Sequence, residues 1–483
     1  MTDDTKTGTA GPGRSEPSEA DAAGTALLLA WSLAEPSRLG EVAFAEGRGP
    51  WVLGRGAARD DDPGPRLLFA PHRPGAARKE PAPLLCPALS RRQLVMTRAA
   101  GGITIERTGK LSLEVNGRKL DRATIAPGDV LLLEGQMALL CIERARGAFM
   151  RGSEPAFAFG EADGFGIVGE SVTTWTMRDT IDFYGRRESH VLVTGPSGAG
   201  KELAARAIHA LSPRRAGPFV ARNAATLPDG IVDAELFGNA KNYPNAGMRE
   251  RAGLVGEADG GTLFLDEIGE LPSYVQAHLL RLLDAGEYHR LGEDRARRCD
   301  LRLVAATNRD EDALKHDLLA RLKLRLEIPG IDERVEDVPL LARAILQEVS
   351  RRDAQLRERF FTDDAPRVEP ALIAALLRHS YTGHVRELES LLLLSMAESR
   401  HDRLTLSAGV SRRLRLKRIA DAPPSRDEIA RALDDADGNV SHAWKALGLS
   451  SRDALNRLLK KHGMTRREPA GDATSPRSRR GRT

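Results

Sequence analysis

The chain has 483 residues, of which 41% are hydrophobic and 29% are charged. This balance is typical of folded, water-soluble proteins, and the length predicts two to four domains. The net charge of +4 is too small to indicate nucleic-acid binding by itself. The three cysteines are far apart and fit no metal-ligand spacing. Because no signal pattern or bilayer-length apolar run is present, we expect a cytoplasmic protein without membrane segments.

In the N-terminal part of the chain, a polar segment is followed by patterns that predict β-strands. Residues 1–24 are rich in Thr, Gly, Asp and Ser, and we expect them to be disordered. Residues 25–145 contain short apolar or alternating runs, and Asn116–Gly117 is a hairpin turn signal. The segment is predicted to be a β-sandwich, followed by a linker over 146–164.

The next segment contains a glycine-rich phosphate loop. Residues 191–202 read VLVTGPSGAGKE, an apolar strand followed by a glycine-rich turn, a lysine and a helical run. Such a turn lets backbone N–H groups close on a polyphosphate, while the lysine adds a positive charge. A chance glycine loop remains the alternative for this pattern taken alone. The residues predicted to bind nucleotide here are Gly195, Pro196, Ser197, Gly198, Ala199, Gly200, Lys201 and Glu202.

Two further strands end in polar side chains that suit the same chemistry. The apolar strand at 262–265 ends in Asp266 and Glu267, and the strand at 301–307 ends in Asn308. A carboxylate at a strand end can hold Mg²⁺, so Asp266 is the metal candidate. The neighbouring Glu267 can activate a water molecule, and Asn308 can sense the γ-phosphate. Three such strand ends predict an α/β nucleotide site.

The C-terminal part reads as helices. Residues 333–396 carry apolar faces of helical period, which indicates a helical lid, and a basic connector covers 401–424. Residues 425–464 read as short helices with a turn glycine and a basic last helix, which favours a helix-turn-helix over a plain helical bundle with a solvated face. The tail at 465–483 is basic and predicted to be disordered. The predicted DNA-binding residues are Ser451, Arg452, Asn456, Arg457 and Lys460.

Residues 166 to 464 resemble the bacterial enhancer-binding proteins, the AAA+ activators of sigma-54 RNA polymerase. The resemblance lies in GPSGAGKE, GGTLFLDEIGELP, RNAATLPDGIVDAELFG, HDLLARLKLRLEIPGIDERVEDVPLL and YTGHVRELES. It implies a central α/β P-loop ATPase over 165–400 with a lid over 334–400, and a C-terminal unit of Fis type. It further implies ATP and Mg²⁺ as cofactors, a homo-oligomeric ring, and sigma-54 holoenzyme and upstream promoter DNA as partners.

The resemblance also assigns roles to single residues. Glu202 is ordinary at its position in this family, and Asn223 matches the asparagine that works with Glu267. Arg321 matches an arginine finger that acts on the neighbouring subunit, and Arg386 matches the sensor arginine of the lid. Ordinary surface ion pairing is the alternative for both arginines.

One family signature is altered. The GAFTGA loop that touches sigma-54 is replaced by NYPNAG over 242–247, so Tyr243, Pro244 and Asn245 stand at its tip. Proline fixes the backbone and removes a hydrogen-bond donor.

Residues 27 to 143 resemble the forkhead-associated (FHA) domain through Gly54–Arg55, Ser90–Arg91 and Asn116–Gly117. This resemblance implies binding of a phosphothreonine protein by Arg55, Ser90, Arg91 and Asn116. The family's usual histidine after this Ser-Arg-Arg is Gln93. A sandwich used only for other protein contacts is the alternative.

These features predict an ATP-dependent, DNA-binding regulator of sigma-54 RNA polymerase under phosphothreonine control. Two alternatives remain open at this point. One is a DNA-binding AAA+ regulator that does not engage sigma-54, and the other is a phospho-dependent scaffold with a vestigial ATPase.

Overall fold

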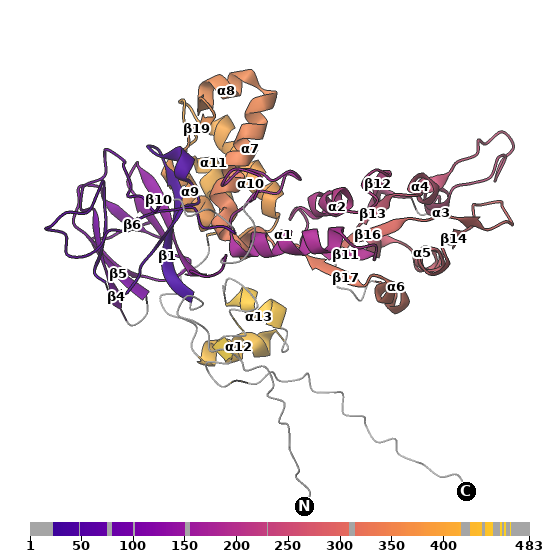
Figure 1. The fold of residues 1–483 in the computed structure, drawn as a ribbon, viewed down its shortest axis with the longest axis horizontal. Helices are drawn as coiled ribbons and strands as arrows, with labels where there is room; N and C mark the ends of the chain where they lie inside the picture. The colour runs from indigo at the N-terminus through magenta and orange to yellow at the C-terminus, as the bar shows by residue number, and fades with distance from the viewer. Residues whose placement is uncertain are drawn as a thin grey trace, which may run out of the picture. The chain divides into compact units, whose positions relative to one another are not determined.

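A computed structural model describes residues 23–47, 49–74, 80–99, 102–149, 155–228, 230–308, 314–416, 426–436 and 440–447, with Leu455, Leu458, Leu459 and Met464. The chain divides into two compact units, the first ending at Leu414 and the second beginning at Arg415. The first unit contains the N-terminal strands, the central α/β region and the lid helices (Figure 1). Within the described residues, none of the helices combines the length and the apolar character needed to cross a membrane.

The N-terminal region is a sandwich of two antiparallel sheets. In the described part of this region, one sheet has the order β2-β1-β10-β9-β6-β7 and the other β3-β4-β5-β8. Apolar residues from both sheets, such as Leu29, Leu94 and Leu139, share one core. The predicted sandwich is therefore present, although its first strand begins two residues inside the segment expected to be disordered. The strands are β1 (Ala23–Ser32), β2 (Val42–Phe44), β3 (Trp51–Leu53), β4 (Leu94–Ala99), β5 (Gly102–Arg107), β6 (Leu113–Val115), β7 (Arg118–Lys119), β8 (Arg122–Ile125), β9 (Val130–Leu133) and β10 (Met137–Ala145).

The sheet that contains β1 and β10 is buried on both faces. Successive side chains of a strand point to opposite faces. Leu139 and Cys141 of β10 enter the sandwich core, while Leu140 and Ile142 enter a second core that also contains lid residues. Burial on both sides explains why β1 and β10 read as continuous apolar runs instead of alternating ones.

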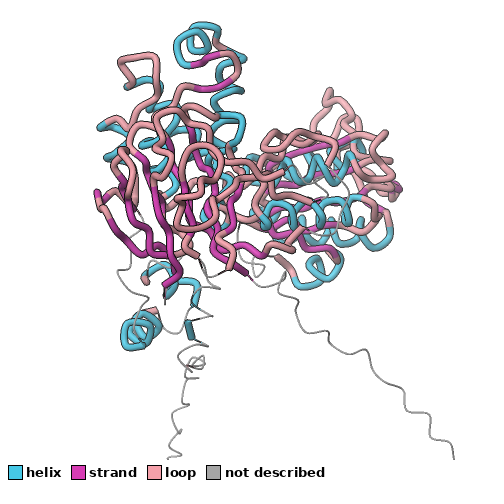
Figure 2. Tube along the Cα trace, turned by 60° about the vertical axis from the view of Figure 1, so that its left-hand side comes forward, coloured by secondary structure: helices cyan, strands magenta, loops and turns pink. Residues whose placement is uncertain are grey.

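The central region is a parallel sheet with helices on either side of its strands (Figures 1 and 2). The described sheet has the order β12-β13-β16-β11-β17, which places the phosphate-loop strand β11 inside the sheet. The strands are β11 (Val191–Thr194), β12 (Phe219–Asn223), β13 (Thr262–Asp266), β16 (Arg302–Thr307) and β17 (Leu324–Glu327), with a separate hairpin of β14 (Glu287–Tyr288) and β15 (Arg297–Arg298). The helices are α1 (Val172–Gly185), α2 (Lys201–Ala210), α3 (Val232–Phe237), α4 (Gly253–Glu257), α5 (Ser273–Ala285) and α6 (His316–Arg321).

The lid follows directly and is mostly helical. Its elements are α7 (Val338–Arg352), α8 (Ala354–Phe360), β18 (Phe361–Thr362), β19 (Ala365–Pro366), α9 (Pro370–Leu377), α10 (His384–Glu398) and α11 (Ala408–Arg413). Helix α9 has the sequence PALIAALL and is buried over almost its whole length. A helix that is apolar all round must be covered on every side, which the lid and the sandwich achieve together.

The second unit is described only in part. Helices α12 (Arg426–Asp435) and α13 (Val440–Ala446) share a small apolar core to which Leu455 and Leu459 also contribute. All five predicted DNA-binding residues, and the tail at 465–483, lie outside the described residues.

Candidate nucleotide site

The phosphate loop connects β11 to α2. At Gly198 the backbone has a φ of +79°, and an added Cβ would lie 2.8 Å from the Gly383 carbonyl oxygen of the lid. Glycine is therefore required both by the left-handed backbone and by the close approach of the lid. The six residues from Gly195 to Gly200 lead into the first turn of α2, where unpaired N–H groups favour an anion.

The loop lysine is held beside the predicted catalytic carboxylate. Lys201 is buried, and its Nζ donates to the Gly195 carbonyl oxygen at 3.0 Å. The same Nζ lies 3.8 Å from Oε1 of Glu267. Among the residues that the structure describes, the hydrogen-bond acceptors of this ammonium group are carbonyl oxygens of its own loop, so the group remains available to a phosphate oxygen. Glu202 instead turns to the surface, where it pairs with Arg206 at 2.7 Å.

The ends of three neighbouring strands meet at this loop, as predicted. Asn223 is in register with Asp266 across β12 and β13, and Thr194 with Thr307 across β11 and β16. The backbone N–H of Asn308 donates to Oε2 of Glu267 at 3.1 Å. Parallel strands present their carboxyl ends at one edge, so the metal candidate Asp266 lies at the same edge.

Two of these side chains have well-defined local partners. Asn223 accepts a hydrogen bond from the Ala225 N–H at 2.9 Å, which fixes its amide at the end of β12. Asp266 accepts one from the Glu267 N–H at 3.1 Å, and Glu267 has a φ of +53°. The left-handed backbone at Glu267 turns the chain sharply, so the adjacent carboxylates of Asp266 and Glu267 can have different functions.

The lid touches the phosphate loop directly. Arg386 Nη1 donates to the Ser197 hydroxyl at 3.2 Å, and the Val385 N–H donates to the Gly198 carbonyl oxygen at 3.3 Å. Two segments almost 190 residues apart thus meet at the predicted nucleotide site, with Ser197 and Arg386 separated by 189 positions. The sequence motifs predicted both partners, but not their contact.

Two buried residues behind the loop were missed by the sequence analysis. Arg334 donates from Nη2 to the Ala199 carbonyl oxygen at 3.1 Å. Asp337 accepts from the N–H groups of Glu170 and Ser171 at 2.7 and 2.9 Å, and from the Thr174 hydroxyl at 2.6 Å. Together they fasten the start of the lid to the loop and to the N-terminus of α1. Their signal in the sequence is the charged stretch IDERVED between two apolar segments.

The predicted finger lies outside this cluster. Arg321 ends α6, is partly exposed, and pairs with Asp284 of α5. Lys315, where the family often has a second arginine, precedes the same helix, and its N–H donates to Gln276 at 3.0 Å. A partly exposed arginine away from its own chain's phosphate loop suits a role toward a neighbouring subunit.

The altered loop forms a hairpin whose base is tightly bonded. Buried Asn239 donates from its amide to the carbonyl oxygens of Ala240 and Arg249 at 2.9 and 3.1 Å, and exchanges backbone bonds with Arg251. At the tip, Tyr243 packs so closely on Gly292 that a Cβ there would lie 2.5 Å from its ring. Residues 241–250 are all exposed.

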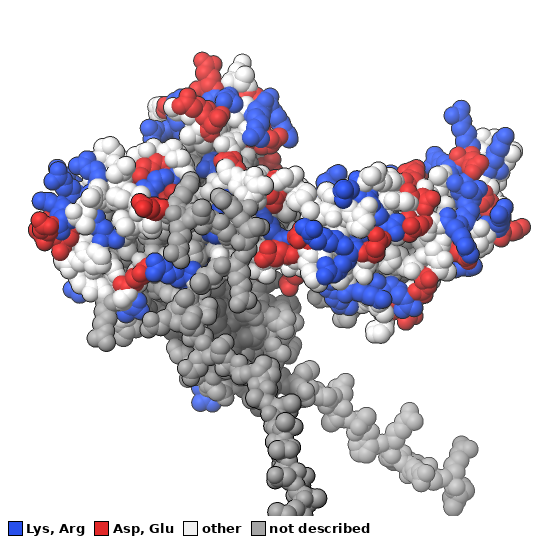
Figure 3. All heavy atoms as spheres, viewed as in Figure 1, with Lys and Arg blue, Asp and Glu red and all other residues white. Residues whose placement is uncertain are grey.

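Figure 1 shows the hairpin at 239–251 and the neighbouring loop beyond β14 projecting from the same end of the central region. Figure 3 shows Lys and Arg side chains prominent at this end. The basic residues of the hairpin, of the loop beyond β14 and of strand β15 are Lys241, Arg249, Arg251, Arg290, Arg295, Arg297 and Arg298.

The sandwich brings together only part of the predicted phosphopeptide site. The buried guanidinium of Arg66 donates to the carbonyl oxygens of Arg55 and Arg91 at 3.1 and 2.8 Å, which ties their loops together. The Ser90 hydroxyl accepts the Lys110 N–H at 2.9 Å. Gln93 is fully buried and donates to the Leu111 carbonyl oxygen at 2.8 Å, so it braces the same loops.

The structure does not bring Asn116 to these loops. Lys110 precedes β6, whereas Asn116 follows it, so the two lie at opposite ends of that strand. Asn116 is buried, donates to Asp129 at 2.7 Å and accepts the Val130 N–H at 2.9 Å. Its amide serves the hairpin turn, and the short Asn-Gly pattern did not distinguish a turn from a ligand-binding loop.

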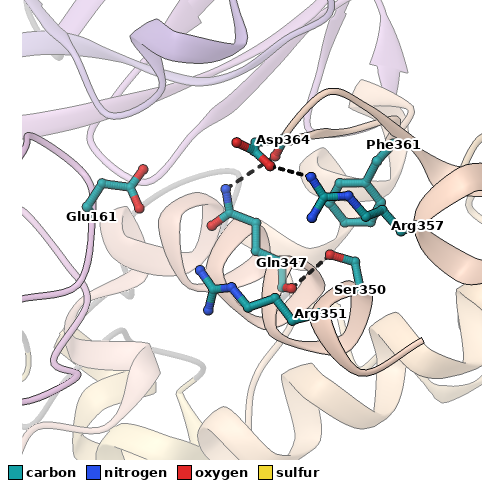
Figure 4. A pocket seen from close by; sticks show the side chains of 7 residues that line it. All are labelled: Glu161, Gln347, Ser350, Arg351, Arg357, Phe361 and Asp364. Carbon is teal, nitrogen blue, oxygen red and sulfur yellow. Dashed lines mark hydrogen bonds and ion pairs between the residues drawn. The ribbon is translucent and has the colours of Figure 1, made fainter. Parts of the chain in front are cut away.

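A surface pocket of about 380 Å³ lies on the lid instead of at the nucleotide site. Figure 4 shows Asp364 bridging Gln347 and Arg357 across it. Arg351 also pairs with Glu348 at 3.0 Å. Because these charges already have partners, the pocket offers no unpaired charge to a nucleotide. Within the described part of the chain, no group of three or more His, Cys, Asp or Glu residues could hold a metal by itself.

Comparison with known proteins agrees with this geometry. Residues 167–329 match the Sigma-54 interaction domain, and residues 332–415 match the AAA+ ATPase lid domain. The chain is 37% identical to the Nif-specific regulatory protein of Azotobacter vinelandii over 311 residues. This alignment covers 60% of this chain and 58% of that protein. It is 35% identical over 312 residues to the transcriptional regulatory protein ZraR of Escherichia coli K12, which covers 62% of this chain and 69% of that protein.

Among solved structures, NtrX from Brucella abortus in complex with ADP is 30% identical, with a TM-score of 0.46, over 62% of this chain and 70% of that one. The two family matches, together with the fold and the nucleotide site, define an AAA+ ATPase with its lid. More particularly, the chain belongs to the family of sigma-54-dependent transcriptional activators.

Proposed function

We propose that this chain is a transcriptional regulator that hydrolyses ATP between the subunits of a homo-oligomeric ring and uses the energy to remodel sigma-54 RNA polymerase. The observation that carries the proposal is the position of Glu267. Its carboxylate lies between the Lys201 ammonium group and the Asn308 N–H, at the edge where the strands β11, β13 and β16 end. A carboxylate so placed can orient and deprotonate a water that attacks the γ-phosphate.

The remaining residues have complementary tasks. Gly195 to Lys201 would bind the phosphates, and Asp266 would hold Mg²⁺, which commonly uses one carboxylate together with phosphate oxygens. Bound Mg²⁺ would neutralise charge on the phosphates. Asn223 would orient Glu267, and Asn308 and Arg386 would respond to the γ-phosphate. Arg321 would stabilise transition-state charge at the neighbouring subunit's site.

The flanking regions supply targeting and control. The C-terminal unit, through Ser451, Arg452, Asn456, Arg457 and Lys460, would bind DNA upstream of the promoter. The sandwich would bind a phosphothreonine protein in the manner of an FHA domain, through Arg55, Ser90 and Arg91. The Arg66 bonds to the Arg55 and Arg91 carbonyls support this role, because they hold both arginine-bearing loops together.

A second candidate function follows from the altered loop. Tyr243, Pro244 and Asn245 stand where the resembled family has its sigma-54 contact. A regulator that binds DNA and ATP, but acts on another partner, would retain the nucleotide site and change only this tip. The hydrogen bonds of Asn239 at the base of the loop support a retained contact made by the exposed Tyr243, and we favour this candidate.

In vitro transcription from a sigma-54 promoter tests the proposal. We expect the native chain to support transcription, Glu267→Ala to bind ATP without turnover or transcript, and Tyr243→Ala to keep ATP turnover but lose transcript. Met248→Ala, which removes another exposed apolar side chain of the same hairpin, is the matched control and should leave transcription intact.

Full ATP turnover by Glu267→Ala would refute the assigned role of that residue. ATP turnover and DNA binding by the native chain, without transcript and without a sigma-54 complex in a pull-down with a transition-state analogue, would favour the second candidate.

A further inference from the structure

The sandwich and the lid share a single apolar core. Leu28 of β1, Val130 of β9 and Leu140 of β10 belong to the same buried cluster as Leu372 and Leu376 of α9. Helix α9 contacts all three of these strands. Neither partner could lose the other without exposing a large apolar surface to water.

Buried polar contacts fix the two parts in register. The Trp31 indole Nε1 donates to the Val368 carbonyl oxygen at 3.1 Å, across 337 positions of sequence. Arg144 of β10 pairs with Glu336 at the start of the lid, and the Arg144 side chain is almost fully buried. An arginine buried at such a junction needs its acid, so the pair resists sliding of one part over the other.

Helix α9 crosses the sheet from one side to the other. Val368, just before α9, receives the bond from Trp31 of β1. Arg378, just after α9, faces the turn between β6 and β7, where a Cβ on Gly117 would lie 2.7 Å from its Nη1. The helix is therefore hydrogen-bonded to the sheet just before its first residue and packed closely against it just after its last.

The segment after α9 leads straight to the nucleotide site. His379 Nε2 and Glu387 Oε1 lie 3.0 Å apart. The other carboxylate oxygen of Glu387 accepts the N–H groups of Thr382 and Gly383, each at 2.7 Å. This turn carries Gly383 against Gly198, and the next residues contribute the bonds from Val385 and Arg386 to the phosphate loop.

We propose that the sandwich and the lid move as one body, and that the His379–Glu387 pair couples this body to the phosphate loop. The position of the N-terminal sandwich then depends on the bound nucleotide. By linkage, if bound nucleotide changes the affinity of the sandwich for a ligand by some factor, that ligand changes the affinity for nucleotide by the same factor. The inference rests on the ATPase alone, so it can hold even if the proposed sigma-54, DNA or phosphopeptide binding does not.

Two tryptophans offer a matched test in the full-length chain. Trp31 and Trp51 are equally buried at 2% exposure, and each indole donates to a backbone carbonyl. The acceptor of Trp31 is in the lid, whereas the acceptor of Trp51 is Glu46 of the sandwich itself. Phenylalanine keeps the ring and removes the bond in both cases.

We expect Trp31→Phe to speed the amide exchange of β1 and α9 together by at least about threefold, the effect of one hydrogen bond lost within the shared body. Trp51→Phe should leave the exchange of α9 unchanged while losing similar thermal stability. Equal exchange of α9 in the two variants would overturn the shared body.

Hydrogen exchange of the native protein provides an independent readout that does not depend on a variant folding. If the two parts are one body, α9 and strands β9 and β10 should exchange at a common slow rate and respond together to the analogue. The one-body inference would be overturned if the sandwich strands exchanged at rates independent of α9, or if their exchange rates did not change when the analogue binds.

Glu387 is assigned as a positioning residue, and its own variants separate that role from general stability. Glu387→Ala should raise the KM for ATP about tenfold with a smaller change in kcat, because the turn at Gly383 is released. Glu387→Gln keeps one acceptor oxygen and should recover part of the loss. Glu348→Ala, which removes an exposed acid paired with Arg351 and Arg352, should have no effect on KM. An unchanged KM in Glu387→Ala would exclude the pair as the link.

Discussion

At the scale of single residues, the nucleotide site depends on a few positions where backbone and side chain are both constrained. Gly198 meets the lid, Lys201 is buried against its own loop, and Glu267 adopts a left-handed backbone at the end of β13. Such constraints hold the reacting groups before any nucleotide arrives. Preorganised groups avoid the cost of reorganising during the reaction.

Gly198 allows the first prediction. In Gly198→Ala, the Cβ would lie 2.8 Å from the Gly383 carbonyl oxygen on a backbone with a φ of +79°. Left-handed strain of about 1–2 kcal/mol and the steric conflict should weaken ATP binding by about tenfold or more. Calorimetry on the full-length protein measures this effect.

Gly128→Ala is the control for left-handed backbone strain without a steric conflict. Its φ is +100°, but an added Cβ meets no atom within 4 Å. This variant should lose some stability and bind ATP normally. If Gly198→Ala also bound ATP normally, the close contact between the lid and the loop would be wrong.

At the scale of elements, the central sheet is held partly by groups that tolerate only one protonation state. His190, which precedes β11, accepts the Leu303 N–H of β16 at its Nδ1, at 3.0 Å. Burial, together with the positive charge of Arg302, lowers the pKa of His190 to about 4. Protonation of Nδ1 would remove this link between two neighbouring strands.

The lowered pKa predicts acid sensitivity of the fold. Since the folded-state pKa lies below the unfolded value of about 6.5, the stabilisation is complete above that pH and is lost as pH falls toward 4. His190 alone would then cost at most about 3 kcal/mol of unfolding free energy. Chemical denaturation between pH 7 and about pH 4.5 measures the slope.

His190→Asn is the informative variant, because the amide oxygen can accept the same N–H without titrating. It should flatten the acid slope, though not abolish it, since burial also lowers the pKa of His72 to about 4. A slope identical to that of the native chain would show that His190 does not contribute.

At the scale of the whole molecule, the proposed function requires a second chain to complete the site. Arg321 faces Asp284 on the surface of α6 and α5, away from its own phosphate loop. Hydrolysis should therefore depend on assembly, with the arginine of one subunit completing the site of the next.

Mixing two inactive variants tests this arrangement. Lys201→Ala should not bind ATP but keeps its arginine, whereas Arg321→Ala should bind ATP but lacks the finger. Each alone should be inactive, and an equal mixture should regain turnover at roughly a quarter of its interfaces, as random assembly requires. No turnover in any mixture, at any protein concentration, would place the role of Arg321 within its own chain.

The sequence by itself determined the position and class of the central ATPase, because the residues of its nucleotide site occur in contiguous segments. The phosphate loop before Lys201 and the acidic strand end at Asp266 and Glu267 each combine a strand, a turn and a reactive group within a few residues. The covered strands were visible as apolar runs, and the helical period of residues 333–396 indicated the lid. Local patterns are readable when the function needs neighbours in the chain.

Only the tertiary structure decided which distant segments meet. It placed Asn116 in a hairpin turn away from Arg55 and Ser90, set Arg334 behind the phosphate loop, and joined Trp31 to Val368. These outcomes depend on packing between segments hundreds of residues apart. The sequence of a strand that is buried on both faces indicates that both faces are covered, but it does not indicate which segment covers them. Burial of apolar area is non-directional, so the identity of the covering partner emerges only when the whole chain is folded.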